Sequence, residues 1–147
     1  MGGEPAKGTT LERDISFAEW QGLQQVYRAN AGKPFCAKAV AYMDFWGWDS
    51  ADFQVETGLL PKNHSLIING KVKRMSADNA VALCKGLRLT LPLAMDLLHS
   101  AHIAISDGED DEYLRYILEV KMGASVDECN AFLKKIGKPK LGSKTAA

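Results

Sequence analysis

Signals that begin and end short helices recur along the central part of this chain. Ser16 and Glu19, like Ser125 and Glu128, have the spacing of a capping box, in which the two side chains satisfy free N–H groups at a helix start. Glycines follow the apolar runs, and glycine is common just after the end of a helix. Within each run the apolar residues recur three or four positions apart, which places them on one helical face. The pattern predicts helices over about 17–31, 35–46, 50–57, 61–69, 77–85, 91–102, 108–121 and 126–136, and no strand.

This succession of helices predicts an all-α fold. The chain has 147 residues, of which 46% are hydrophobic and 24% charged, so it can bury the core of one ordinary domain. Residues 1–15 and 143–147 show no periodicity and are expected to be flexible tails. Between them we expect an N-terminal helix within 16–34, a core over 35–106 and a C-terminal helical extension over 107–142.

Three features predict a cytoplasmic protein with no membrane partner. No apolar run approaches the ~18 residues of a membrane span. The first fifteen residues contain no apolar block of the kind a secretory signal has. Cys36, Cys84 and Cys129 lie far apart in the sequence, a pattern typical of reduced, buried thiols.

Charge is unevenly distributed, although lysine plus arginine and aspartate plus glutamate both number 18. Residues 58–88 contain six basic residues and one acidic residue, whereas residues 107–128 contain eight acidic and two basic ones. A basic stretch around two short helices is the electrostatic footprint expected for phosphate binding. A solvated surface is the alternative interpretation of the same charges.

The basic stretch contains two short expected helices joined by a tight turn. Gly58 permits the left-handed turn between them. Leu59 is expected to fill the angle, Ile67 to anchor the second helix, and a basic loop over 71–74 follows. In such a pair, the first helix can cross a phosphate backbone while the second presents its N-terminal part to the major groove.

The region resembles the Cro/lambda-repressor-like helix-turn-helix family of bacterial regulators. The resemblance is carried by Asp49-Ser50, Phe53, Thr57-Gly58-Leu59, Ile67, Asn69-Gly70-Lys71, Ser76, Ala82-Leu83 and Gly86-Leu87. Downstream residues resemble a subgroup with extra C-terminal helices, through Leu89-Thr90-Leu91, Ala94, Leu97-Leu98, Ala101, Ile105-Ser106 and the 137–142 segment. The resemblance spans about 35–142. It implies a lambda-repressor-like core with one added N-terminal helix and two C-terminal helices.

The resemblance also implies a DNA-binding transcriptional regulator that binds double-stranded DNA. We expect a homodimer, because one short recognition helix gives little affinity. In such folds, residues at the start of the second helix touch bases and the following loop touches phosphates. Ser50 takes the place of the phosphate-contacting first residue. The implied base and phosphate contacts are Lys62, Asn63, Ser65, Lys71, Lys73 and Arg74.

Several positions depart from the family and open an alternative. Leu60 stands where a polar N-cap is usual, His64 stands where an apolar core residue is usual, and Leu66 has no polar atom for base contact. A surface formed by Leu60, Leu66 and Ile68 suits protein contact, which favours a protein–protein interaction module on a degenerate helix-turn-helix fold, such as an antitoxin, defence or regulatory subunit. For Ile68, the helical spacing of His64, Ile67 and Ile68 favours burial in a core stripe over protein contact.

The sequence predicts no enzyme, no cofactor and no metal site. His99 and His102 are followed by Asp107, but no cysteine lies near them to complete a zinc site. The acidic run over 109–112 does not have the spacing of a calcium loop, and it fits a helix first turn. We find no phosphate-binding glycine loop and no nucleophile–base spacing.

Overall fold

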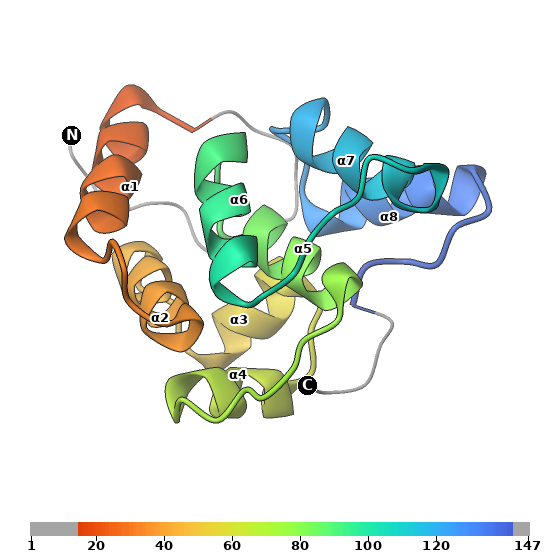
Figure 1. Cartoon of the computed structure of the whole chain (residues 1–147). Coiled ribbons are helices and arrows are strands. Elements are labelled where there is room, and N and C mark those ends of the chain that lie inside the picture. The colour runs from red at the N-terminus through yellow and green to blue at the C-terminus, as the bar shows by residue number, and fades with distance from the viewer. Residues whose placement is uncertain (1–14, 143–147) are drawn as a thin grey trace.

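The structure, a computed structural model, describes residues 15–142. All regular elements in this range are helical, which confirms the all-α prediction (Figure 1). They are α1 (Phe17–Ala29), α2 (Phe35–Trp46), α3 (Ser50–Thr57), α4 (Pro61–Ile68), α5 (Ala77–Gly86), α6 (Leu91–Ser100), the 3-10 turn η1 (Glu109–Asp111), α7 (Glu112–Glu119) and α8 (Val126–Lys135). The expected tails lie outside the described residues except for Ile15, which packs against the core.

The predicted helix starts are made by local hydrogen bonds. The Glu19 backbone N–H donates to Ser16 Oγ over 3.0 Å, and the Ser16 N–H donates to Glu19 Oε1 over 2.8 Å. The same reciprocal pair forms before α8, between Ser125 and Glu128. Seven of the eight α-helices agree closely with the predicted ranges, whereas the expected 108–121 helix begins with η1 and becomes regular only in α7.

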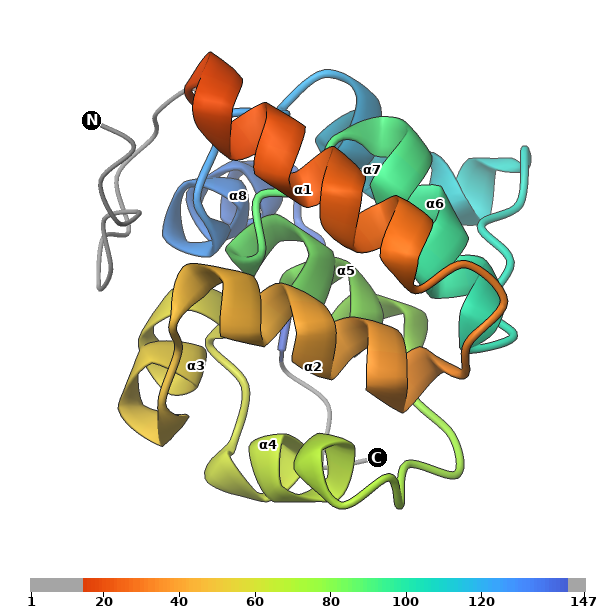
Figure 2. The same cartoon turned by 90° about the vertical axis from the view of Figure 1, so that its left-hand side faces the viewer.

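Helix α5 is the centre of the fold, because nine of its ten residues are buried and the first, Ala77, is partly buried. It packs against α3, α6, α7 and α8, while α1 lies outside on α2 (Figure 2). A helix that is buried all round must be closely approached by its neighbours. Gly86 meets this demand, since a Cβ there would lie 2.8 Å from the backbone oxygen of Glu56, near the end of α3.

Charged side chains that are buried tie neighbouring helices together. Lys38 on α2 pairs with Asp96 on α6 over 2.8 Å. Lys85 on α5 donates to the backbone oxygens of Ile117 and Lys121, at the end of α7. Lys85 and Arg88 are both buried, so the basic footprint expected over 58–88 is reduced at the surface.

The C-terminal segment after α8 returns to the bend between α3 and α4. Leu141 is buried, and its N–H donates to Asn130 Oδ1 over 2.7 Å. A Cβ on Gly142 would lie 3.2 Å from the backbone oxygen of Gly58. The C-terminal extension therefore braces the bend from behind.

Candidate functional site

Helices α3 and α4 form the site because local bonding sets the bend between them. Asp49 caps α3 through a reciprocal pair with Asp52, at 2.8 and 3.0 Å. At the other end, the Thr57 hydroxyl donates to the Phe53 oxygen over 2.7 Å and accepts the Leu59 N–H over 3.0 Å. Gly58 then adopts φ 72°, the left-handed region that favours glycine. Three residues thus turn the chain from α3 into α4.

Helix α4 lies at one edge of the molecule, where it is attached by its inner face only (Figures 1 and 2). Two of its eight residues, Asn63 and Ile67, are buried. Half-buried His64 packs on Phe53, with ring centroids 5.0 Å apart. The expectation that Ile67 anchors this helix is confirmed. Leu60, at the N-cap, makes no side-chain cap hydrogen bond.

The burial of Asn63 corrects the expectation that this residue reads bases. Its side chain is 1% exposed. Asn63 and Ile67 are four residues apart, so they lie on the same face of the helix, and the anchor Ile67 points that face into the core. Asn63 is therefore a core residue.

The outward face of α4 has a polar centre. Lys62, Ser65 and Asn69 are exposed and follow one another at i, i+3 and i+7, which places them on one stripe. Asn69 Nδ2 donates to the Ser65 backbone oxygen over 2.9 Å. Asn69 was absent from the residues expected to touch DNA, although its spacing from Lys62 was a signal for it.

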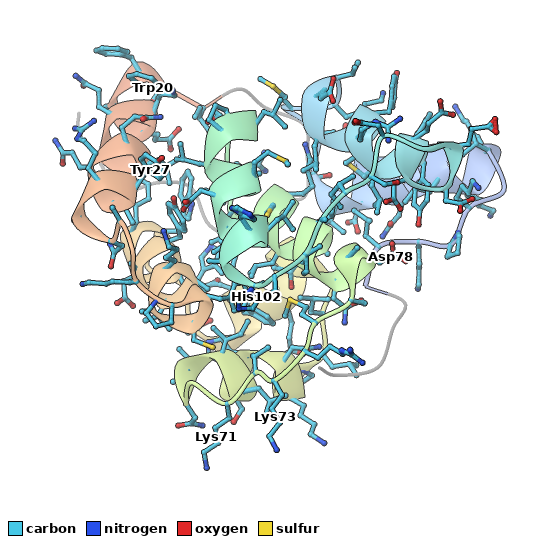
Figure 3. The ribbon with its side chains drawn as sticks, in the orientation of Figure 1. Trp20, Tyr27, Lys71, Lys73, Asp78 and His102 are labelled. Carbon is cyan, nitrogen blue, oxygen red and sulfur yellow. The ribbon has the colours of Figure 1, made fainter. Side chains whose placement is uncertain are left out.

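The loop after α4 adds three exposed cationic side chains to this edge. They are Lys71, Lys73 and Arg74, while Val72 between them is partly buried against the core. Figure 3 shows Lys71 and Lys73 pointing away from the body of the molecule. Within residues 15–142, no ion pair or hydrogen bond engages the side-chain nitrogens of Lys62 or of these three residues. Their charges are thus directed to solvent.

Ser50 is exposed in the first turn of α3, as a phosphate contact at that position requires. Its backbone oxygen accepts the Gln54 side-chain amide over 3.3 Å, which leaves the Ser50 hydroxyl outside this interaction. The structure therefore places five of the seven expected DNA-contacting residues on or beside the α4 edge, Ser50 at the start of α3 and Asn63 in the core.

The three apolar residues considered for protein contact do not form one patch. Leu60 is 50% exposed at the start of α4, and Ile68 is 49% exposed at its end, while Leu66 is half-buried. Ile68 borders a shallow groove of about 550 Å³ between α2 and α4, with Val40 on the opposite wall. Leu60 does not line that groove. The core-stripe interpretation of Ile68 is wrong, because the side chain is half exposed.

Most of the acidic segment lies away from the α4 edge: α7 and the far part of α8 stand at the other end of the molecule from α4 (Figures 1 and 2). The start of α8 does reach the bend, since a Cβ on Gly58 would lie 3.7 Å from Val126 Cγ1. Across residues 15–142, no three histidine, cysteine or acidic side chains are grouped so as to hold a metal ion. No helix in this described range is both long and apolar enough to cross a bilayer.

Comparisons with protein-family models, with curated proteins and with solved structures find no match to this chain. What the α4 edge can do is therefore decided by its own side chains: a polar stripe, a cationic loop and separated apolar residues.

Proposed function

We propose that this chain binds double-stranded DNA through α3 and α4, as a helix-turn-helix regulator of transcription. The observation that carries the proposal is the α4 edge, where a polar stripe and a cationic loop face solvent together. Lysine and arginine side chains with no anionic partner inside the described chain are suited to neutralise external phosphates.

The two helices would divide the contacts. Ser50, in the first turn of α3, would approach the phosphate backbone through its exposed hydroxyl. Lys62 and Ser65 would enter the major groove, since lysine suits the guanine O6 and N7 acceptors and serine pairs with several base edges. Lys71, Lys73 and Arg74 would hold adjacent phosphates, which add affinity without sequence information.

A homodimer is part of this proposal. The base-reading part of α4 is short, with two of the expected base-contacting side chains exposed. One such helix reads few base pairs, and regulators of this architecture usually bind two half-sites through a two-fold dimer. The half-sites would then lie about 34 Å apart, or a multiple of that distance.

A salt titration with random-sequence duplex DNA tests the proposal. We expect log K to fall against log salt by about 0.9 for each neutralised phosphate, hence by about 2.7 for the loop of one chain. The double variant Lys71→Ala/Lys73→Ala should lower that slope by about 1.8 per chain. The matched control is Lys134→Ala/Lys135→Ala, which removes two exposed lysines from α8. Absence of binding at low salt rejects the proposal.

The exposure of Ile68 beside the α2–α4 groove favours a second candidate, a protein–protein interaction module such as an antitoxin, defence or regulatory subunit. An apolar side chain that is half exposed next to Val40 suits a partner's apolar residue. The discriminating pair is Ile68→Glu and Lys71→Ala/Lys73→Ala, assayed in the native host. Loss of activity in Ile68→Glu alone supports the protein partner, and loss in the lysine variant alone supports DNA.

A further inference from the structure

We infer that the cavity between α2, the loop after α4 and the end of α6 binds a small organic anion with an apolar body. Its volume is about 520 Å³, within the range of about 300–1,000 Å³ that small-molecule sites occupy. Three chain segments that are distant in the sequence form its walls. The site is separate from the outward stripe of α4.

The cavity has an apolar floor and a cationic rim. Phe35, Val72 and Met75 supply apolar surface, and Met75 and Phe35 are themselves part of the buried core. Lys73 and Arg74, from the same loop as Val72, and His102, after α6, line the same cavity. No aspartate or glutamate is among the described residues that line it. This combination suits a carboxylate or phosphate head attached to an apolar body.

His102 adds a polar group at an unusual backbone position. It has φ 61° and follows the end of α6, where its N–H donates to the His99 oxygen over 2.9 Å and the next N–H donates to the Leu98 oxygen over 3.0 Å. Glycine is the usual residue at this place in a helix end. The chain instead holds an imidazole here, which lines the same cavity as Lys73 although the two residues are distant in the sequence.

The consequence for regulation rests on the proposed function. Lys73 and Arg74 border the cavity and are also two of the three proposed phosphate contacts. An anion bound between Arg74 and His102 would neutralise the positive charge of Arg74, which would then no longer be available to a DNA phosphate. The two ligands would then compete, and each would weaken the other by the same factor.

Alkylation of Cys36 by iodoacetamide tests the anion site without DNA. Cys36 lines the cavity and is partly exposed, whereas Cys84 and Cys129 are buried. The probes are benzoate and phenyl phosphate, with neutral benzamide and inorganic phosphate as controls, all at constant ionic strength. We expect benzoate or phenyl phosphate to slow Cys36 alkylation, and both controls to leave it unchanged. Unchanged alkylation with both organic anions, or equal protection by benzamide, overturns the site.

Two variants locate the binding. Arg74→Gln and His102→Gln should each weaken protection by about tenfold, the value of one charge-assisted hydrogen bond. Lys134→Ala, on exposed α8, should not change it. Because both altered side chains are exposed, circular dichroism should show intact helices. Protection that persists in both variants contradicts the assignment.

DNA titration with and without benzoate separates the two proposals. We expect the benzoate concentration that halves DNA binding to be about tenfold higher for His102→Gln, which keeps all proposed DNA contacts, than for the native chain. DNA binding that ignores benzoate while Cys36 is protected overturns the competition. If the chain binds no DNA while the organic anions still slow alkylation of Cys36, the proposed function is overturned and the anion site is supported.

Discussion

The α4 edge and the α7–α8 end of the molecule use charged residues in opposite ways. At the α4 edge, Lys71, Lys73 and Arg74 have no partner within residues 15–142 and face solvent. At the other end, some charged groups make internal contacts, although Asp107, Glu109 and Asp110 are exposed. Lys85 holds two carbonyls at the end of α7, and Arg115 donates to the backbone oxygen of Gly108 over 3.1 Å.

The acidic side of the α7–α8 end follows the same rule. Asp111 accepts the Ser106 N–H over 2.7 Å, and this hydrogen bond lowers the pKa of the carboxyl. Buried Asp78 accepts the Tyr113 hydroxyl over 3.0 Å. Internal contacts thus hold Lys85, Asp78, Asp111 and Arg115 to the fold, whereas the cations of the loop after α4 are directed to solvent.

The largest expected effect is at Gly86, where α5 packs closely against the backbone of α3. Gly86→Ala places a methyl group 2.8 Å from the Glu56 oxygen, a backbone atom that cannot yield cheaply. We expect the free energy of unfolding to fall by about 3 kcal/mol, measured by urea denaturation. Gly108→Ala is the matched control, because its nearest neighbour is 3.5 Å away. Equal stability of the two variants would show that α5 does not press on α3.

The comparison itself is tested by two lysines. Lys85→Met removes the donor to the Ile117 and Lys121 oxygens, and we expect a loss of about 2 kcal/mol because carbonyls at the end of α7 are left without this donor. Lys71→Met, at the exposed edge, should change stability by less than about 0.5 kcal/mol. Denaturation curves measure both. A larger effect at Lys71 would reverse the distinction between the regions.

Asn63 and Ser65 sharpen the boundary between core and surface within α4. Asn63→Ala truncates a buried polar side chain and should cost about 1–2 kcal/mol. Ser65→Ala, on the exposed stripe, should leave the unfolding transition nearly unchanged and alter only DNA sequence preference. The measurements are thermal unfolding and binding to a randomised duplex library. An altered preference in a stable Asn63→Ala variant would return this residue to the DNA surface.

The smallest effect is a pH dependence at the α7–α8 end. Burial and nearby Asp78 raise the pKa of Tyr113 to about 12, from an ordinary value of 10.0. The protonated phenol is favoured in the folded chain, so its contribution is complete below pH 10 and is lost as the pH rises toward 12. Between pH 10 and 12, the free energy of unfolding of Tyr113→Phe should fall less steeply than that of the native chain. Urea denaturation at several pH values measures both. Parallel declines would contradict the assignment.

Several features of the fold and site followed from short stretches of sequence. Ser16 with Glu19, and Ser125 with Glu128, cap helices through partners three residues away, so their bonds were predictable. The bend at Gly58 and the anchor Ile67 were predictable for the same reason. The third capping pair, Asp49 with Asp52, was not expected in full, because aspartate in place of glutamate is a less specific signal.

Other features were not predictable from local pattern. Asn63 is polar, yet it shares the inner face with Ile67 and is buried. Lys85 and Arg88 belong to a basic stretch, yet they enter the interior, because α5 is covered on every side. The cavity that Lys73, Arg74 and His102 share is built from three segments spread between Pro34 and His102, so no short window of sequence contains it.

By itself, the sequence determined where helices begin and end and that they make an all-α protein, because caps, glycine turns and apolar periodicity act over three or four residues. Only the tertiary structure decided which face of α4 points outward and which cations reach solvent. Those outcomes depend on which side chains are buried against distant helices. A charged group that is buried without a partner destabilises the fold, so a cation can enter the interior only where it meets an acceptor.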